Sequence, residues 1–388
     1  MTRKLIYVDN AATTKISEDC LNAMMPYLTK EYGNPSSIYS IAHNAKFALE
    51  DARAEIANSL GANPQEIYFT SCGTESNNWA IKSVAYLKAK EGKKNIITTN
   101  FEHHSVLNTA KHLEKNGFNV TYLPVNKDGI LNPKKLEEAL NENTALVSIM
   151  YANNEIGTIQ DIKTMARICK NNDVVFHTDA VQAVGHVKIN LNKEDIGMLS
   201  ISGHKINAPK GVGVLYVKKG TKIANLMHGG GQEKSLRPGT ENVAYVVGLA
   251  KALKNAVNNI DEKENRLKIL RDMLLNGITK SIEKVYVNGS LENRLAGNLN
   301  ISFEGIEGES LLLMLDSYGI CASSGSACTS NSLEPSHVLL AIGKKPELAH
   351  GSLRISLSEN NTEEEMKYIL EAIIKSVEKL RRISPIWP

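Results

Sequence analysis

The sequence predicts an α/β protein in which a mostly parallel mixed sheet is flanked by helices and is followed by a smaller α+β unit. Between residues 66 and 217, short apolar runs typical of buried strands alternate with segments of helical periodicity. Beyond residue 242 this alternation stops, and long helical stretches enclose only a few short strands. Because the chain of 388 residues exceeds the usual size of a single core, two domains are expected.

The N-terminal part is expected to hold one short strand and two helices. An apolar run before Asp9 indicates the strand, and a polar turn follows it. The first helix begins after Ser17, a suitable N-cap residue, and extends to Tyr27. A second helical spacing covers residues 40–60, where Gly61 ends it.

The alternating region supplies the sheet and the helices that cover it. Its apolar runs predict strands at 66–70, 95–99, 120–125, 145–151, 174–177, 198–201 and 212–217. Its helical segments lie between these strands, at 74–90, 104–117, 133–140 and 162–170. In such a sheet, ligands gather at the carboxyl ends of the strands.

The C-terminal part predicts a different arrangement. A helical stretch from 243 to about 281 precedes short strands, further helix and a C-terminal helix, with the strands at 285–287, 298–303 and 352–356 and the last helix at 362–382. We therefore expect a large domain of residues 15–255. Residues 1–14 are expected to join residues 256–388 in a small domain that carries Cys328.

The composition argues against several classes of protein. The formal net charge is only +3, from 45 Lys and Arg against 42 Asp and Glu, so neither a nucleic acid nor a membrane surface is an expected partner. No apolar run approaches the roughly 20 residues of a transmembrane helix, and the first residues lack a signal-peptide core, so a cytoplasmic location is expected. The five cysteines form no CxxC pair and do not cluster with histidines, so no disulfide framework and no metal site are expected.

Two neighbouring strands are expected to deliver a lysine and an aspartate to one edge of the sheet. The run at 198–201 leads to Lys205, and the run at 174–176 leads to Asp179. A lone lysine in such a loop is most simply a solvated surface group. Paired with an aspartate, however, it fits an enzyme that uses pyridoxal 5′-phosphate (PLP), in which the lysine binds the cofactor aldehyde and the aspartate keeps the pyridine nitrogen protonated.

Two helix starts add further candidate residues. Gly73 and Thr74 open a helix directly after a strand, where free backbone N–H groups make a natural phosphate site, with plain helix capping as the alternative. His103 occupies the same kind of position. Its imidazole is suited to stacking on a cofactor ring or to proton transfer, and a capping hydrogen bond is the alternative.

Three other polar side chains are candidates for ligand contacts. Asn154 follows an apolar strand, and either it or Asn153 is expected to bond only to local backbone. Gln182 lies three residues after Asp179 and has the same potential use. Arg354, in a β-like run with apolar neighbours, is suited to a bidentate grip on a substrate carboxylate, with a surface ion pair as the alternative.

Cys328 lies in a run of small polar residues, 321–335, that has little capacity for packing and is expected to form a mobile loop. Since a cysteine in such a loop is not a core residue, Cys328 is a candidate reactive thiol. Cys321, next to the apolar stretch at 311–320, is expected to take part in packing.

Over nearly its whole length, the chain resembles the cysteine desulfurases of the NifS/IscS type, which are PLP enzymes of the class V aminotransferase group. The motifs that carry the resemblance occur in the family's order and are Asp9-Asn-Ala-Ala-Thr-Thr14, Gly33-Asn-Pro-Ser-Ser37, Thr74-Glu-Ser-Asn-Asn78, His177-Thr-Asp-Ala-Val-Gln182, Ser202-Gly-His-Lys205 and Ser323-Ser-Gly-Ser-Ala-Cys-Thr-Ser330. The sequence departs from the family's pattern at Tyr39, Ala42, Asn207, Ala208 and Pro238.

The resemblance implies a fold-type-I homodimer with PLP as cofactor and active sites at the subunit interface. Lys205 would form the Schiff base, Asp179 would pair with the pyridine nitrogen, and His103 would stack on the ring. Asn154 and Gln182 would contact the ring oxygen. The residues implied for phosphate binding are Gly73, Thr74, Ser202, His204 and, from the other subunit, Thr240. The substrate carboxylate would bind to Arg354 with help from an asparagine, Asn154 or Asn34.

The implied reaction converts L-cysteine to L-alanine. Cys328 would take the sulfur as a persulfide and pass it to a NifU/IscU-type scaffold or another acceptor protein, for iron–sulfur cluster assembly or thiolation. No resident metal is implied, and a transient contact of Cys328 with an iron–sulfur cluster stays open. Two other functions also stay open: a selenocysteine lyase or another class V C–S lyase, and a PLP-binding scaffold that is active only with a partner.

Overall fold

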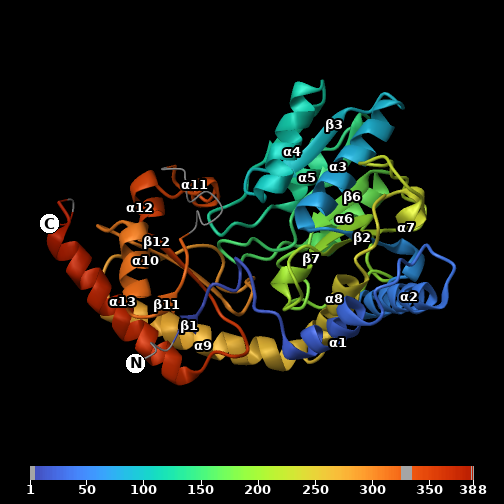
Figure 1. The fold of residues 1–388 in the computed structure, drawn as a ribbon. Coiled ribbons are helices and arrows are strands. Elements are labelled where there is room, and N and C mark those ends of the chain that lie inside the picture. The colour runs from blue at the N-terminus through green and yellow to red at the C-terminus, as the bar shows by residue number, and fades with distance from the viewer. Residues whose placement is uncertain (1–4, 325–333, 386, 388) are drawn as a thin grey trace.

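A seven-stranded mixed sheet forms the centre of the larger part of the molecule (Figure 1). The computed structural model describes residues 5–324, 334–385 and 387. The strands lie in the order β2 (Ile67–Thr70), β8 (Gly213–Val217), β7 (Met198–Ser202), β6 (Val175–Asp179), β5 (Thr144–Ser148), β3 (Asn95–Thr99) and β4 (Asn119–Leu123). All neighbouring pairs are parallel except those of β8 with β2 and β7. The predicted fold class, a mostly parallel mixed sheet flanked by helices, is confirmed.

Both faces of this sheet are buried, as the near-continuous apolar strands require. Successive residues such as Ile96 and Ile97, or Leu146 and Val147, belong to two different hydrophobic clusters. One cluster includes residues of α3 (Gly73–Ala89) and α4 (His104–Lys115). The other includes residues of the helices α1 (Glu18–Thr29), α2 (Ser40–Leu60), α6 (Ile162–Asn171) and α8 (Val243–Val257). The short helix α5 (Pro133–Ala139) adds Leu136 to this second cluster.

Local signals set several helix ends where the sequence predicts them. The Ser17 side chain accepts a hydrogen bond from the Cys20 N–H at the start of α1. Gly61 ends α2 in the left-handed conformation, with φ of 63°. The predicted helix from 243 to 281 is wrong in one respect, because it is two helices, α8 and α9 (Ile260–Ser281). Asn259 separates them with a φ of 57°, a left-handed conformation that asparagine adopts more readily than most residues.

A second, antiparallel sheet lies in the smaller part, in the order β12 (Ser352–Ser356), β10 (Asn298–Phe303) and β9 (Val285–Val287). A separate hydrophobic cluster surrounds it and draws on α9, α10 (Gly308–Ser317) and α13 (Glu363–Ile383). The short helices α11 (His337–Ala341) and α12 (Pro346–His350) lie beside this part (Figure 1). Within the described residues, no helix is long and apolar enough to cross a membrane.

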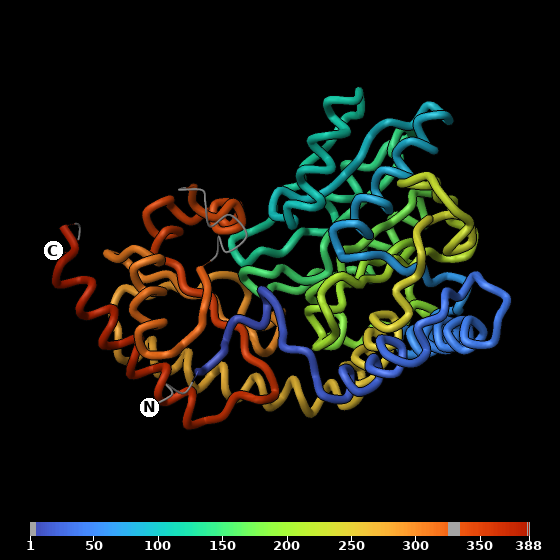
Figure 2. Tube along the Cα trace, in the orientation of Figure 1, coloured from blue at the N-terminus to red at the C-terminus, as the bar shows by residue number. Residues whose placement is uncertain are grey.

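The N-terminal segment crosses from the smaller part to the larger one, as the blue end of the trace shows (Figure 2). Strand β1 (Ile6–Tyr7) pairs in parallel with β11 (Ile320–Cys321), and Ile6 and Val8 are buried in the cluster of the smaller part. The chain then enters α1, which packs on α8. The predicted domain limits, at residues 15 and 255, stay a prediction.

Candidate active site

Asp179 and Lys205 are delivered by adjacent strands to the same edge of the large sheet. Asp179 is the last residue of β6, which pairs in parallel with β7, and Ser202 is the last residue of β7. Lys205 lies in the single 3-10 turn that follows, Gly203–Lys205. The carboxyl ends of parallel strands are where open α/β sheets bind ligands, so this edge is the candidate site.

A hydrogen-bonded chain joins Asp179 to His103 through two side chains of the covering helices. Asn77 of α3 donates from Nδ2 to Asp179 Oδ2 at 2.6 Å and to Ser105 Oγ at 2.8 Å. Ser105 Oγ lies 2.8 Å from His103 Nδ1, and the Ser105 N–H donates to the same nitrogen. The second Asp179 oxygen accepts the Val181 N–H at 3.0 Å. The Asp179 carboxylate is therefore fixed in place before any ligand binds.

The Nδ1 atom of His103 accepts the Ser105 N–H and so caps the start of α4. The helix-capping role that the sequence offered as an alternative for His103 is therefore confirmed for this nitrogen. Burial is the main cause that lowers the pKa of His103, Lys205 lowers it further, and Asp179 opposes the shift. Since Nδ1 accepts a backbone N–H, the proton of the neutral imidazole lies on Nε2. The imidazole face and Nε2 are thus available for a ligand.

The segment Ala11–Thr14 contacts three of the residues predicted from sequence. Lys205 Nζ donates to the carbonyl oxygens of Ala11 and Ala12, the latter at 2.7 Å. Gln182 Nε2 donates to the Ala11 oxygen at 3.0 Å. His204 Nδ1 lies 3.2 Å from Thr13 Oγ1, and burial is the main cause that lowers the His204 pKa to about 4. These residues belong to the motif Asp9–Thr14, but the sequence predicted no role for them at the site.

The start of α3 has no room for a side chain at its first residue, Gly73. A Cβ built on Gly73 would lie 2.7 Å from Val181 Cγ2 and 3.4 Å from Ser202 Cβ. The first N–H groups of this 17-residue helix therefore meet the ends of β6 and β7 closely. Such an arrangement of a glycine, free N–H groups and a buried serine is suited to a phosphate group.

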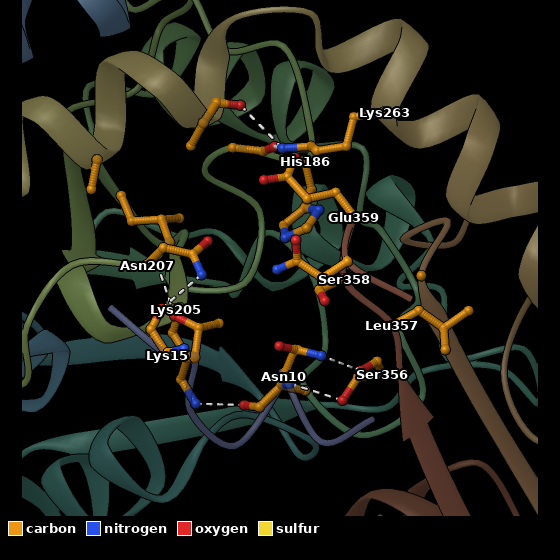
Figure 3. Close-up of a pocket in the computed structure, with 18 of the residues that line it drawn as sticks. Asn10, Lys15, His186, Lys205, Asn207, Lys263, Ser356, Leu357, Ser358 and Glu359 are labelled. Atoms are coloured by element: carbon orange, nitrogen blue, oxygen red, sulfur yellow. Dashed lines mark hydrogen bonds between the residues drawn. The ribbon is translucent and has the colours of Figure 1, made fainter. Parts of the chain in front are cut away.

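The residues around this edge line two cavities. Thr74 and His103 line one of them. Lys205 and Gln182 line another, of about 370 Å³, which is also bordered by Asn10 (Figure 3). The candidate site lies where residues from both parts of the molecule approach Lys205.

Arg354 is a buried residue of β12, so the alternative of a surface arginine is wrong. Its guanidinium does form an ion pair, from Nη2 to Asp9 Oδ1 at 2.9 Å. Nη1 donates to the Asn154 carbonyl oxygen at 3.1 Å. The neighbouring Asn153 has the local role expected for one of the two asparagines, because its Oδ1 accepts the Glu155 N–H at 2.8 Å. Arg354 and Asn154 are thus brought together.

Comparison with known proteins decides the family. Residues 6–369 match the family model "Aminotransferase class-V". The chain belongs to the class V aminotransferase family. It is 53% identical to the "Cysteine desulfurase IscS" of Methanosarcina thermophila, over 99% of this chain and 95% of that protein. It is 50% identical to the protein of the same name from Clostridium botulinum (strain Hall), over 99% of this chain and 97% of that protein. A solved structure titled "NIFS-LIKE PROTEIN" is similar, with a TM-score of 0.92, 41% identity and coverage of 97% of this chain and 100% of that one.

Class V aminotransferases are PLP-dependent enzymes, so the cofactor of this protein is PLP. The residues present fit that group. A buried carboxylate held by Asn77 suits a protonated pyridine nitrogen, and the helix start at Gly73, which carries no side chain, suits a phosphate. Lys205 supplies the amine at the same edge. In this class V protein the roles of individual residues remain proposals.

Asn34 and Thr240 do not join the site within one chain. Asn34 is exposed in the connection between α1 and α2, where its Oδ1 accepts the Ser36 N–H at 2.9 Å. Thr240 is exposed in the segment before α8. Neither residue lines the cavities that contain Lys205 or His103. Thr240 was expected to act from the other subunit, and the predicted roles of both residues stay predictions.

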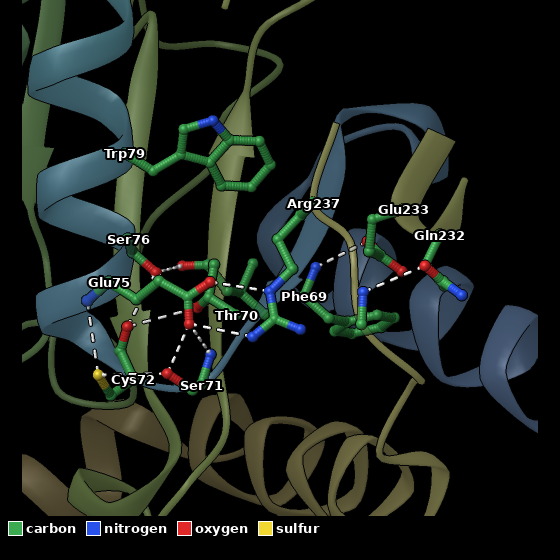
Figure 4. A network of polar contacts seen from close by, with 12 residues as sticks. Phe69, Thr70, Ser71, Cys72, Glu75, Ser76, Trp79, Gln232, Glu233 and Arg237 are labelled. Carbon is green, nitrogen blue, oxygen red and sulfur yellow. Dashed lines mark hydrogen bonds and ion pairs between the residues drawn. The ribbon is translucent and has the colours of Figure 1, made fainter. Parts of the chain in front are cut away.

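The segment that precedes Thr240 is firmly held by polar contacts (Figure 4). Arg237 donates from Nε and Nη2 to the Glu75 carboxylate, at 2.8 and 3.1 Å. Burial opposes ionisation of Glu75, but the hydrogen bonds from Arg237 and Ser71 lower its pKa overall. Glu233, in the short helix α7 (Gln232–Ser235), accepts the Phe69 N–H at 2.8 Å. The Thr240 segment is therefore tied to the start of α3 and to β2.

Two buried carboxyl groups near the site were not found from the sequence, because nothing marks them as buried there. Burial is the main cause that raises the pKa of Glu102 to about 8 and that of Glu155 to about 7. Glu102 Oε1 accepts hydrogen bonds from Thr99 Oγ1 at 2.6 Å and from the Met150 N–H at 3.0 Å. Ser336 Oγ donates to Glu155.

Cys328 lies outside the described residues. Cys321 is half-buried in β11, and burial is the main cause that raises its pKa. Cys20 and Cys169 are fully buried thiols, with pKa values raised to about 11 and about 12. Across the part of the chain that the structure describes, no three His, Cys, Asp or Glu side chains form a metal-ligand group.

Proposed function

We propose that the protein is a cysteine desulfurase, which converts L-cysteine to L-alanine and transfers the sulfur to Cys328 as a persulfide. The observation that carries this proposal is the identity of about half of all residues, along 99% of the chain, with proteins named cysteine desulfurase. The geometry at the sheet edge supports it, since a lysine, a held aspartate and a buried arginine converge there.

The cofactor-binding roles follow the sequence-based assignment. Lys205 binds PLP through its amine, Asp179 pairs with the pyridine nitrogen, and His103 stacks on the ring. Asn154 and Gln182 contact the ring oxygen. The phosphate is bound by Gly73, Thr74, Ser202, His204 and, in a homodimer, by Thr240 of the second subunit. When bound, PLP supplies an electron sink that stabilises negative charge at the substrate Cα.

The chain's own groups then bind the substrate and move its protons. Arg354 binds the α-carboxylate, with Asn154 or Asn34 assisting. The Lys205 amine accepts the Cα proton and later returns a proton to carbon. His103, neutral with its proton on Nε2, is available to exchange a proton with the substrate.

Sulfur transfer is assigned to Cys328. Its thiolate attacks the sulfur of the substrate, so that an S–S bond forms as the Cβ–S bond breaks. The electron pair of the broken bond stays on the carbon side, which is protonated to give alanine. An acceptor thiol, on an IscU-type scaffold or another partner, then takes the sulfane sulfur from the Cys328 persulfide.

The test is a turnover assay on the purified protein loaded with PLP. L-cysteine with a thiol reductant is expected to yield alanine and sulfide in equal amounts, and a Lys205→Ala variant is expected to yield neither. A Cys328→Ser variant should keep the visible absorption of bound PLP but form no persulfide. Faster turnover of selenocysteine than of cysteine would favour a selenocysteine lyase, and turnover only with an added acceptor would favour a partner-dependent enzyme. Alanine production that persists in the Lys205→Ala variant would contradict the proposal.

A further inference from the structure

Asp9 reaches Arg354 because the N-terminal segment runs along the edge of strand β12. Asp9 forms a parallel β-bridge with Ser356, the last residue of that strand. The Ser356 N–H donates to the Val8 carbonyl oxygen at 2.7 Å, and the Asn10 N–H donates to the Ser356 oxygen at 3.2 Å. The main chain itself therefore sets the position of Asp9, independently of its ion pair.

The Arg354 guanidinium is anchored at its two outer nitrogens. Nη2 bonds to the Asp9 carboxylate and Nη1 to the Asn154 carbonyl oxygen. Nε is buried and has no hydrogen-bond partner among the residues that the structure describes. The Arg354 side chain is 2% exposed and that of Asp9 is 18% exposed. The guanidinium is thus oriented by protein groups, and its buried Nε is a donor that the described groups do not satisfy.

The same N-terminal segment contacts the lysine of the site. Two residues after Asp9, the Ala11 carbonyl oxygen accepts hydrogen bonds from Lys205 and Gln182. The ion pair of Asp9 with Arg354 therefore links the proposed carboxylate-binding residue to the segment that contacts Lys205.

The charge of Asp9 also acts on the ligand. An α-carboxylate bound by Arg354 would lie near the Asp9 carboxylate, so one positive charge would face two negative charges. In poorly solvated surroundings such interactions are strong. Asp9 therefore lowers the affinity of Arg354 for carboxylates. The substrate L-cysteine and the product L-alanine carry the same α-carboxylate, so both are affected.

We infer that Asp9 is a positioning residue that acts through Arg354 and limits its affinity for α-carboxylates, which favours release of alanine after each turnover. This inference rests on the proposed desulfurase function, in which Arg354 binds the substrate carboxylate. It adds Asp9 to that site, a residue for which the sequence predicted no role.

The test measures binding of L-alanine to the PLP-loaded enzyme by calorimetry, for the wild type and for Asp9→Asn, which keeps the side-chain volume and removes the charge. The variant is expected to bind alanine about tenfold more tightly. Its KM for L-cysteine should fall, and its kcat should fall too because alanine leaves more slowly. Asp9→Glu, which restores the charge, is expected to recover most of the wild-type alanine affinity.

Asp272→Asn is the matched control, because Asp272 pairs with Arg271, another buried arginine, on α9 and away from Lys205. It should leave alanine binding unchanged. Unchanged or weaker binding of alanine by folded, PLP-loaded Asp9→Asn would overturn the inference, and Asp9→Ser serves as the neutral variant if Asp9→Asn does not fold. Failure of the proposed function is a separate result, since it would appear as absence of alanine production from cysteine by the wild type.

Discussion

Asn77 of α3 donates a 2.6 Å hydrogen bond to Asp179, the last residue of β6, and so ties a covering helix to the carboxylate at the edge of the sheet. Asn77 is 1% exposed, and its Nδ2 also contacts Ser105, which in turn contacts His103. A single amide thus relates the carboxylate proposed to hold the pyridine nitrogen to the imidazole proposed to stack on the ring.

Asn77→Ala is expected to weaken PLP retention by about tenfold. The substitution leaves Asp179 Oδ2 without a buried donor, and the loss of a hydrogen bond to a charged group costs about 1.5–3 kcal/mol. The effect is measured as the rate of PLP dissociation after dilution, monitored by the loss of the visible absorption of bound PLP. Asn172→Ala is the control, because Asn172 is exposed at the end of α6, where its side chain donates to the Ile168 carbonyl oxygen. Equal PLP retention in the two variants would show that Asn77 does not support the site.

Gly73→Ala is expected to reduce PLP affinity at least as strongly. Its new methyl group would lie 2.7 Å from Val181 Cγ2, so the start of α3 or the end of β6 must shift. The double variant Gly73→Ala/Val181→Ala should recover part of the affinity, because the second substitution removes the atom that the new methyl group meets. Titration of the apoprotein with PLP measures both. The double variant could fail to recover PLP affinity although Val181→Ala alone binds PLP normally. That result would show that the Gly73→Ala effect does not arise from contact with Val181.

Glu233→Gln is expected to destabilise the fold by about 3–5 kcal/mol, because it removes the buried charged partner of the Arg53 guanidinium. The other acidic neighbour, Glu50, lies 3.4 Å from Arg53 Nε but is 57% exposed, so it compensates little. The Glu233 oxygens lie 2.7 and 3.0 Å from Arg53 Nη2 and Nη1, and both side chains are about 95% buried or more. The double variant Arg53→Met/Glu233→Gln should be less destabilised than Glu233→Gln alone. Urea unfolding measures both values.

Asp261→Asn serves as the control for this ion pair. Asp261 pairs with Lys188, and both of these side chains are more than two-thirds exposed, so the loss of charge should change stability far less. The expected order of stability is therefore Asp261→Asn, then the double variant, then Glu233→Gln. A Glu233→Gln protein as stable as Asp261→Asn would show that the buried pair adds nothing.

Glu102→Gln is expected to become more stable than the wild type as the pH rises. Burial raises the Glu102 pKa to about 8 in the fold, above its ordinary value of about 4.5, so the folded state binds the proton more tightly than the unfolded state. Wild-type stability is then lost as the pH rises from about 4.5 through about 8, whereas glutamine does not titrate. The difference between the two proteins should grow by about 3 kcal/mol between pH 5.5 and pH 8.

Denaturant unfolding at several pH values measures this difference, with Glu142→Gln as the control because Glu142 is exposed. The Glu142→Gln curve should run parallel to the wild-type curve. A Glu102→Gln curve that also runs parallel to the wild type would mean that Glu102 has an ordinary pKa in the folded protein.

The strands and helices of the sheet region could be predicted closely because local signals set them. Ser17 and Gly61 bound helices as expected, and the apolar runs became strands buried on both faces. The helix predicted across 243–281 was wrong because helical periodicity continues through Asn259, and only its left-handed backbone shows the break. The domain limits and the residue roles at the site stay predictions.

The sequence by itself determined the fold class and the candidate residues Asp179, His103 and Lys205, because strand ends and helix starts are local features. It also marked Arg354, as a charged residue within an apolar β-like run. Only the tertiary structure decided what holds them. Asn77 lies 102 residues from Asp179, and Asp9 lies 345 residues from Arg354. Contacts over such separations depend on how helices and strands pack, which spacing along the chain does not encode. The ion pair of Asp9 with Arg354 exists because the segment that follows β1 runs along the edge of β12.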